Sequence, residues 1–348
     1  MASTKVDPSA QSQGLAVERL FQAANGYMIS AALSVAAKLK IADLLADGPR
    51  SVADLAAATG SNEDALYRVL RALVSVGFFR ADGPRTFASS PETELLRSDV
   101  AGSIRPMVLW MTDRLHFQVW AEMSYSVETG KPAVEMLYNK PCFEALGDLP
   151  EVAREFNEAM TCFSASVAPA LLEAYDFTGT HTLMDVAGGH GFILCEVLGR
   201  YPEMKGILFD MPGVVDGARS RIESLNLNGR CQTASGDFFT HIPAGADTYY
   251  MQHIIHDWDD ERALTILRNC RQALDTRPNG TLLVMDNVIP DTPQPHFGKL
   301  LDLEMMLLPG GRERSEAEFH RLFRKAGLEI ARILPTRVSQ SLIEAHPA

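Results

Sequence analysis

Residues 181–191 read HTLMDVAGGHG, and this stretch decides the fold. A short apolar strand runs directly into a glycine-rich turn, and GFILCEVLGRY then continues at helical spacing to residue 201. Glycines in a strand-to-helix turn let the backbone come close to a ligand and leave the N–H groups of the helix facing it. The turn therefore favours a ligand-binding α/β domain, although a glycine pair alone also occurs in purely structural turns.

Strands and helices continue to alternate from this turn to the C-terminus. The expected strands are GILFD, RCQTASGD, DTYYMQHII and TLLVMDNVI, and the expected helices cover 212–224 and 259–274. Such alternation predicts a parallel sheet with helices on both faces. After a helix at 315–326, LEIARILPT and SQSLIEAH have no helix between them, so they must form a hairpin with one edge strand antiparallel. Residues 176–348 are thus predicted to form a Rossmann-like catalytic domain of the α/β class.

The part of the chain before this domain has a different pattern. Residues 1–14 are small and polar and are predicted to be disordered. Helices are expected at 15–25, 27–40, 51–60 and 62–77, and FFRADGPRTFAS then places two short strands around the turn residues Asp82 and Gly83. Helices followed by a hairpin predict a winged-helix domain at 15–100. Residues 101–175 are helical in pattern, and we interpret them as a linker and substrate-pocket region.

The charge of the chain argues against nucleic acid as a partner. The 32 Lys and Arg residues are outnumbered by 44 Asp and Glu residues, which gives a net charge of -12, and residues 1–100 hold ten basic and eleven acidic side chains. Groove recognition by a winged helix depends on a concentrated excess of Lys and Arg. We therefore expect this domain to serve packing or dimerisation, and a winged-helix regulator with a ligand-sensing domain is the least favoured alternative.

Cysteine usage and hydropathy bear on the compartment. The cysteines are odd in number and widely spaced, without a Cys-x-x-Cys pair, which is typical of reduced thiols in a cytoplasmic protein. The longest uncharged apolar stretch, residues 21–37, contains Gln22 and Asn25 and is too short and too polar to span a bilayer comfortably. No membrane association is expected. The cysteines are Cys142, Cys162, Cys195, Cys231 and Cys270.

An acidic residue beyond the glycine turn points to a nucleoside. Asp210 follows Gly191 by 19 residues and stands at the carboxyl end of the second expected strand, where a carboxylate can bind both hydroxyls of a ribose. A dinucleotide site would carry a third glycine, and the sequence has Leu194 at that position. The pattern therefore favours a mononucleoside cofactor without phosphate.

A histidine lies at the same predicted edge of the sheet. His256 stands in HIIHDWDD, just after an expected strand and just before a helix, where ligands bind in such folds. As a general base it would suit a phenol, whose pKa of ~10 demands a base within hydrogen-bond reach. Two alternatives remain, a structural histidine in a capping segment and a metal site shared with His253, Asp257 and Asp259. The metal alternative is disfavoured because two histidines three apart on an extended segment point to opposite faces.

Five motifs carry a family resemblance. DVAGGHG, FDMPGVV, GDFF, HDWDDE and GGRERSEAEF, in this order and spacing, resemble the class I S-adenosylmethionine-dependent O-methyltransferases of the plant caffeic-acid type and their bacterial natural-product relatives. The resemblance covers nearly the whole chain, including the winged-helix front that those enzymes use to dimerise. It implies a homodimeric enzyme that methylates a hydroxyl of a small, aromatic substrate, with S-adenosyl-L-methionine as cofactor and no metal.

The resemblance also implies roles for single residues. Glu313 and Asp286 would orient His256, and Asp286 is one methylene shorter than the Glu of the plant enzymes. The methionine part of the cofactor would lie against Gly189 and Gly191, the ribose on Asp210, and the adenine between Met211 and Phe238 with its amine on Asp237. The cofactor set is completed by Asp185, at the start of the glycine motif, and by Gln252, which replaces the usual Lys of the plant enzymes.

The acceptor pocket is the least defined part of the prediction. Met and aromatic side chains in 101–175 form either ordinary helix core or the wall of an apolar pocket, since both kinds adapt to flat ligands. In LDLEMMLLP, Glu304 either meets a polar group of the substrate or belongs to a solvated face. The predicted substrate-binding residues are Trp110, Met160, Phe163, Glu304 and Met305. A cofactor-binding enzyme of the same fold that catalyses a non-methylating step, such as hydroxylation, decarboxylation or a pericyclic reaction, is the second interpretation.

Overall fold

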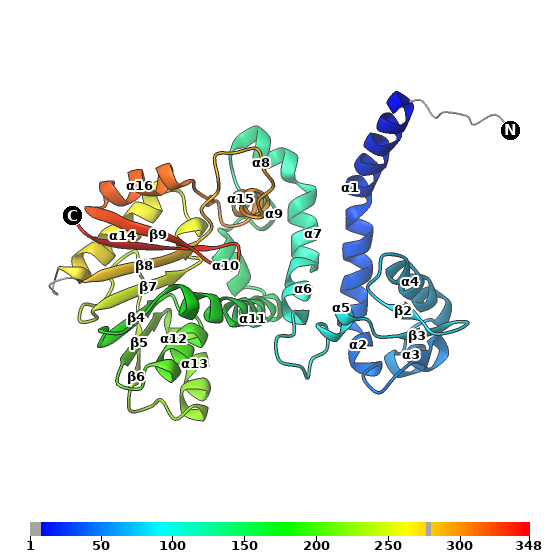
Figure 1. Ribbon diagram of the computed structural model, residues 1–348, viewed down its shortest axis with the longest axis horizontal. Coiled ribbons are helices and arrows are strands. Elements are labelled where there is room, and N and C mark those ends of the chain that lie inside the picture. The colour runs from blue at the N-terminus through cyan, green and yellow to red at the C-terminus, as the bar shows by residue number, and fades with distance from the viewer. Residues whose placement is uncertain (1–7, 276–279) are drawn as a thin grey trace. The chain divides into compact units, whose positions relative to one another are not determined.

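The computed structural model describes residues 8–275 and 280–348 (Figure 1). The chain divides into two compact units, Met1–Arg114 and Leu115–Ala348. Among the described helices, none combines the length and apolar character needed to cross a membrane. The division at Arg114 differs from the predicted boundaries at residues 100 and 175, because the helices of the predicted linker region from residue 115 onward belong to the second unit.

The first unit is helical with a small antiparallel sheet. Its sheet has the order β1-β3-β2, and its core contains Leu55, Leu70 and Phe87. The predicted hairpin at Asp82 and Gly83 is confirmed as β2 and β3. The elements are α1 (Pro8–Lys38), α2 (Ile41–Leu44), β1 (Arg50–Ser51), α3 (Val52–Thr59), α4 (Glu63–Ser75), β2 (Arg80–Ala81), β3 (Thr86–Ala88), α5 (Pro91–Glu94) and α6 (Arg105–Met111).

Helix α1 is longer than predicted. The two expected helices at 15–25 and 27–40 are one continuous helix, because a single internal glycine such as Gly26 weakens a helix by only about 1 kcal/mol relative to alanine. The predicted disorder of residues 1–14 is wrong for residues 8–14, which are helical, while residues 1–7 lie outside the described part of the chain.

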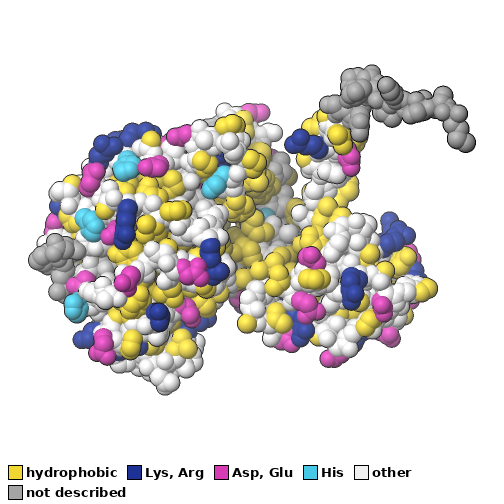
Figure 2. All heavy atoms as spheres, viewed as in Figure 1, with side chains coloured by type: hydrophobic (Ala, Val, Ile, Leu, Met, Phe, Trp, Pro, Cys, Tyr) yellow, Lys and Arg dark blue, Asp and Glu magenta, His cyan; other side chains and the backbone are white. Residues whose placement is uncertain are grey.

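Helix α1 carries large apolar side chains in contact with solvent. Leu20, Phe21 and Tyr27 are 72%, 64% and 60% exposed in the single chain, and Met28 is 52% exposed. Figure 2 shows hydrophobic side chains along this helix. An apolar surface of this kind on one helix marks an interaction site more often than a solvated face.

The second unit contains a seven-stranded sheet enclosed by helices, which confirms the predicted fold class. The helices before the sheet are α7 (Arg114–Ala121), α8 (Met123–Thr129), α9 (Ala133–Tyr138), α10 (Cys142–Gly147) and α11 (Pro150–Ala174). The sheet and its connections comprise β4 (Thr182–Val186), α12 (Phe192–Arg200), β5 (Lys205–Asp210), α13 (Pro212–Ser224), β6 (Cys231–Ser235), β7 (Thr248–Gln252), the 3-10 turn η1 (Ile255–Asp257), α14 (Asp260–Leu274), β8 (Thr281–Asp286), α15 (Gly298–Leu307), α16 (Glu316–Lys325), β9 (Leu328–Pro335) and β10 (Ser341–Pro347).

The order of the strands is β6-β5-β4-β7-β8-β10-β9. Strands β4 to β8 are parallel, and β10 pairs antiparallel with both β8 and β9. The predicted terminal hairpin is therefore confirmed, but its antiparallel strand lies inside the sheet and β9 forms the edge. In the register, Ser341 of β10 stands opposite Asp286, the last residue of β8.

Helices lie on both faces of this sheet (Figure 1). An apolar core lies between the helices and the sheet on each face. One joins α11, α12 and α13 to one face, and the other joins α14 and α16 to the opposite face. Strand β4 shows the alternation: Leu183 belongs to the first core, and Met184 and Val186 belong to the second. Because both faces are buried, the sheet is rigid at the edge where its parallel strands end.

Candidate active site

The predicted cofactor residues gather at one edge of the sheet. Parallel strands β4, β5, β6 and β7 end at Val186, Asp210, Ser235 and Gln252, and ligands in open α/β sheets bind beyond such carboxyl ends. Each predicted cofactor residue lies within five positions of one of these strand ends.

The turn between β4 and α12 needs its glycines for two different reasons. Gly189 and Gly191 have φ angles of 58° and 70°, which L side chains rarely adopt. At Gly188 a Cβ atom would lie 2.5 Å from the carboxylate of Asp185 and 2.6 Å from a methyl group of Leu208, so only glycine fits. A Cβ at Gly189, in contrast, would meet nothing within 4 Å, which leaves open space beside the backbone.

Asp210 is tied to the turn by backbone hydrogen bonds. Its Oδ2 accepts from the N–H of Gly189 at 2.8 Å, and its Oδ1 accepts from the N–H of Met211 at 2.6 Å. Burial raises the pKa of Asp185 to about 7, and the neighbouring charge of Asp210 adds to the effect. Burial also raises the pKa of Asp210, but the two N–H donors lower it. Asp210 is thus the better anion, and it lies beside the open space at Gly189.

The other cofactor residues lie at the ends of the neighbouring strands. Met211 is 54% exposed at the start of α13. Phe238 packs on Phe239 with ring centroids 4.8 Å apart, and Asp237 accepts the N–H of Phe239 at 2.8 Å. Gln252 accepts a hydrogen bond from the hydroxyl of Tyr250 at 3.3 Å. An apolar patch beside a carboxylate suits a nucleoside, and the open glycine backbone suits its aliphatic extension.

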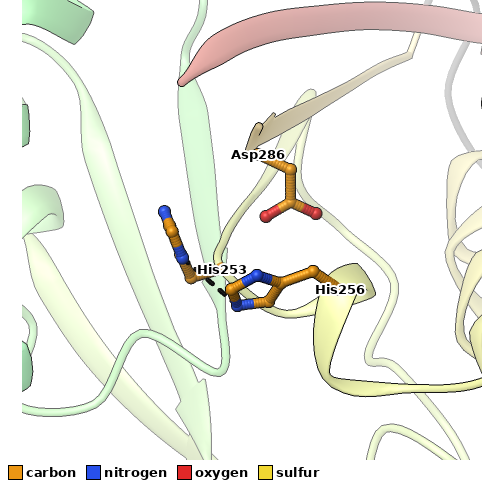
Figure 3. A group of neighbouring side chains, drawn as sticks. All are labelled: His253, His256 and Asp286. Atoms are coloured by element: carbon orange, nitrogen blue, oxygen red, sulfur yellow. Dashed lines mark hydrogen bonds between the residues drawn. The ribbon is translucent and has the colours of Figure 1, made fainter. Parts of the chain in front are cut away.

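His256 lies in the turn that follows β7. The residue is 4% exposed, and its ring is held at both nitrogens. Nδ1 lies 2.7 Å from Oε1 of Glu313. Nε2 lies 3.2 Å from Nδ1 of His253 (Figure 3) and 3.5 Å from Oδ1 of Asp257. Glu313 is buried as well, so the carboxylate and the imidazole form a hydrogen-bonded pair that is shielded from water.

The prediction that His253 and His256 point to opposite faces of an extended segment is wrong. Strand β7 ends at Gln252, not at residue 255, and His253 then adopts a φ of 53°. This left-handed backbone, which costs a non-glycine residue about 1–3 kcal/mol, turns the chain before the 3-10 turn and brings the two rings together. Their centroids are 4.4 Å apart at an interplanar angle of 84°. A strained residue at such a position is a mark of a functional site.

The charges around His256 favour its protonated form. Burial lowers the pKa of His256, but the nearby carboxylates of Glu313, Asp257 and Asp286 outweigh that effect and raise it to about 10. Burial also lowers the pKa of His253 well below its ordinary value, and the neighbouring His256 lowers it further. Of the two rings, His256 is therefore the one that holds an added proton.

Asp286 faces the pair without a hydrogen bond. Both of its carboxylate oxygens are buried and lack a hydrogen-bond partner among the described residues, although Figure 3 shows the carboxylate directed toward the His256 ring. Burial raises its pKa to about 7, and the charge of His256 lowers it. The sequence around Asp286 and Glu313 alone would indicate two solvated loop acids. The structure shows instead that both side chains are buried. Glu313 holds the ring, and Asp286 contributes charge.

The ligand atoms of His253, His256 and Asp286 lie within 4.8 Å of one another. The geometric reason against a shared metal ion therefore fails, since the two histidines do converge. The two ring nitrogens are 3.2 Å apart, at hydrogen-bond distance, so a shared proton can satisfy the pair without an ion.

Two residues that hold the His256 turn escape the sequence analysis. Arg314 is 1% exposed and donates to the carbonyl oxygens of Ile255 and Trp258 at 2.9 and 2.8 Å, and to Asp260. At Gly311 a Cβ would overlap the carbonyl oxygen of His256. Both residues lie in the motif GGRER, but the motif does not indicate that they contact the His256 turn.

The predicted acceptor residues fall into three groups. Phe163 of α11 stands edge-on to His253 with centroids 4.7 Å apart, and Met160 lies one turn earlier on the same helix. Glu304 and Met305 of α15 are buried, and both oxygens of Glu304 accept hydrogen bonds, from Trp120 at 2.6 Å and from His116 at 2.8 Å. The solvated alternative for Glu304 is thus wrong. Trp110 is buried on α6 of the first unit.

Known proteins match this chain over nearly its whole length. A family model described as O-methyltransferase domain matches residues 120–329, and one described as O-methyltransferase dimerisation domain matches residues 21–99. The phenazine O-methyltransferase PhzM of Lysobacter antibioticus is 41% identical over 94% of this chain and 95% of its own. The chain belongs to the O-methyltransferase family. The enzyme is thus an S-adenosylmethionine-dependent methyltransferase, as the motifs predicted.

Two further members of the family bear on cofactor and acceptor. An O-methyltransferase from neocarzinostatin biosynthesis, solved with S-adenosylmethionine and 2-hydroxy-5-methyl naphthoic acid, is 32% identical with a TM-score of 0.78, covering 92% of this chain and 96% of its own. The 8-amino-8-demethylriboflavin N,N-dimethyltransferase of Streptomyces davaonensis is 35% identical over 98% of both chains. The family therefore includes enzymes named for nitrogen as well as for oxygen acceptors.

The position of Asp210 generates a test of the cofactor site. Asp210→Asn removes the charge but keeps the shape of the side chain, so hydrogen bonds from ribose hydroxyls lose about 1.5–3 kcal/mol in total. We expect calorimetry with S-adenosylmethionine to give a dissociation constant raised about tenfold or more. Asp216→Asn, which removes an equal charge from the exposed side of α13, should leave affinity unchanged. Equal affinities of both variants and the unmodified enzyme would contradict the ribose assignment.

Proposed function

We propose that the enzyme transfers the methyl group of S-adenosylmethionine to a hydroxyl of a small aromatic molecule, with His256 as general base. The hydrogen bond between His256 and Glu313 carries this proposal. S-adenosylmethionine supplies an activated methyl group on a sulfonium, and the residues at the ends of β4 to β7 would hold it. Methyl transfer then depends mainly on alignment, because the protein forms no covalent bond in the step.

The buried acids set the strength of the base. A free histidine with a pKa of ~6.5 is a weak acceptor for a phenol proton of pKa ~10. Glu313, Asp257 and Asp286 raise the pKa of His256 to about 10 against the effect of burial, so that proton transfer from a phenol is nearly balanced in free energy. Glu313 also fixes the ring orientation, since its Oε1 accepts the Nδ1 proton.

The proposal of an oxygen acceptor rests on the hydrogen-bonded pair of His256 and Glu313. An aromatic amine keeps its lone pair while neutral and attacks without first losing a proton, whereas a hydroxyl needs a base. A buried histidine and carboxylate with two further acids nearby form such a base. Phe163 beside His253 supports a flat acceptor, as does the naphthoate named with one relative. A non-methylating step would not require the proton acceptor that His256 and Glu313 form.

The assembly proposed is a homodimer formed through the first unit. Support comes from the match to the dimerisation family over residues 21–99 and from the exposed apolar side chains of α1. Phe21, the first residue of that match, and Leu20, directly before it, are among the most exposed of these.

Removal of the base tests the reaction. His256→Ala should bind S-adenosylmethionine normally but lose turnover by about 100- to 10,000-fold, the usual share of general base catalysis. Product analysis should show one S-adenosylhomocysteine per product, with the product heavier by one methylene. Treatment with EDTA should not change the rate, because no metal takes part. Product without S-adenosylhomocysteine would establish the non-methylating alternative, and EDTA-sensitive turnover would revive a metal site at His253, His256 and Asp286.

The charge of Glu313 should appear in the pH profile. The base acts when unprotonated, so kcat/KM should rise with pH up to the pKa of His256, which is about 10. Glu313→Gln removes a carboxylate that raises this pKa, and the profile should level off at lower pH and at a lower rate. Glu316→Gln, at an exposed acid of α16, is the matched control and should keep the original profile. An unshifted profile in Glu313→Gln would mean that another group titrates.

The apolar surface of α1 tests the assembly. Sedimentation of the intact enzyme should give twice the chain mass of 38.2 kDa. Leu20→Glu places a charge on that surface and should shift the equilibrium toward the monomer. Leu225→Glu makes the same change at an exposed leucine of the second unit and should sediment like the unmodified enzyme. A monomer at micromolar concentration for the unmodified chain would contradict the proposed dimer.

A further inference from the structure

A second histidine covers the nitrogen through which His256 would act. Nδ1 of His256 is committed to Glu313, which leaves Nε2 as its remaining acceptor. Nε2 lies 3.2 Å from Nδ1 of His253, and Figure 3 shows the rest of the His253 ring directed away from His256. A hydroxyl that approaches Nε2 of His256 from this side therefore contacts the ring of His253 before it reaches His256.

The hydrogen bonds also determine where the protons lie. The carboxylate of Glu313 only accepts, so neutral His256 carries its proton on Nδ1 and a lone pair on Nε2. The bond between the rings then requires His253 to donate from Nδ1, which leaves the lone pair of His253 on its own Nε2. That atom is buried and has no hydrogen-bond partner among the described residues. While His256 is neutral, the free basic position of the row Glu313–His256–His253 is therefore at His253. Below the His256 pKa of about 10 the row holds one more proton, which must leave before the hydroxyl proton can be accepted.

The surroundings of His253 fit an aromatic acceptor. Phe163 of α11 contacts the ring edge-on, with centroids 4.7 Å apart. The backbone N–H of His253 donates to the carbonyl of Met285 at 3.1 Å, so the left-handed turn is anchored to β8. The ring is thus fixed between an aromatic wall and the base, and its one unsatisfied atom is a proton acceptor.

We propose that His253 is a second catalytic residue, which takes the proton of the acceptor hydroxyl at Nε2 and passes its Nδ1 proton to Nε2 of His256. The O–H bond of the acceptor breaks as an N–H bond forms on His253 Nε2. The Nδ1–H bond of His253 breaks as an N–H bond forms on His256 Nε2. The acceptor oxygen keeps the electron pair for its attack on the methyl group. The inference rests on the methyl transfer proposed above.

The charges on the two rings favour this direction of transfer. His256 faces the carboxylates of Glu313, Asp257 and Asp286, which stabilise the positive charge that arrives there. His253 faces His256 and the apolar ring of Phe163, with the buried carboxyl group of Asp286 also within 4.8 Å. Burial lowers the pKa of His253 well below the ordinary value. A proton that enters at His253 is therefore released to His256, and His253 is neutral before and after the step.

Replacement of His253 by an aromatic ring that can neither donate nor accept a proton tests the relay. In His253→Phe we expect kcat to fall about 10- to 100-fold, with S-adenosylmethionine affinity unchanged and one S-adenosylhomocysteine still formed per product. Phe163→Leu alters the packing against the same ring without removing the proton path, and it should change KM for the acceptor more than kcat. In His253→Ala, added imidazole should restore part of kcat, which a purely structural role of His253 would not allow.

Nitrogen-15 NMR of the imidazole side chains gives a readout that needs no turnover. In the cofactor-free enzyme above pH 10, where His256 is neutral, His253 should carry its proton on Nδ1. A proton on Nε2 instead, or full kcat in His253→Phe, would overturn the relay and leave His256 to act directly. That result would leave the proposed function intact. The proposed function fails if the unmodified enzyme forms product without S-adenosylhomocysteine, or if His256→Ala keeps full turnover.

Discussion

The contact between the segment 311–314 and the turn that carries His256 determines the geometry of the site. The N–H of Arg312 donates to the carbonyl of His256 at 2.8 Å, and Gly311 lies so close to that carbonyl that no side chain fits. The guanidinium of Arg314 binds two further carbonyls of the turn. Glu313 projects from the middle of this segment, so the acid and the base are positioned by one backbone contact.

A buried arginine in this place has an electrostatic cost that its partners offset. Burial of a guanidinium is unfavourable unless its five N–H donors are satisfied. Arg314 reaches Asp260 and two carbonyls of the turn. Its positive charge also lowers the pKa of the buried Asp286, which offsets part of the effect of burial on that carboxyl group.

The sequence predicts the frame of the molecule better than the contacts within the site. The sheet can be identified from the alternation of apolar strands and helices in the sequence. Because both faces of the sheet are buried, successive strand residues such as Leu183 and Met184 are both apolar. The glycine turn and Asp210 can also be predicted from the sequence, since the need for glycine in the turn and for an acid at the end of the strand depends on neighbouring residues. The meeting of His253 with His256 depends on a left-handed residue that is not glycine, and the burial of Arg314 depends on carbonyls more than fifty positions away in the chain. Neither leaves a local pattern.

The position of β10 links the site to the order in which the chain is made. Strand β8 has β7 on one side and only β10 on the other, and Ser341 pairs opposite Asp286. During synthesis the outer edge of β8 therefore stays unpaired until β10 has left the ribosome, since domains fold from the N-terminus as they emerge. A chain stalled before β10 would expose that edge to pairing with other chains. The emergence of β10 is thus the step that commits a nascent molecule to a complete sheet and a finished site.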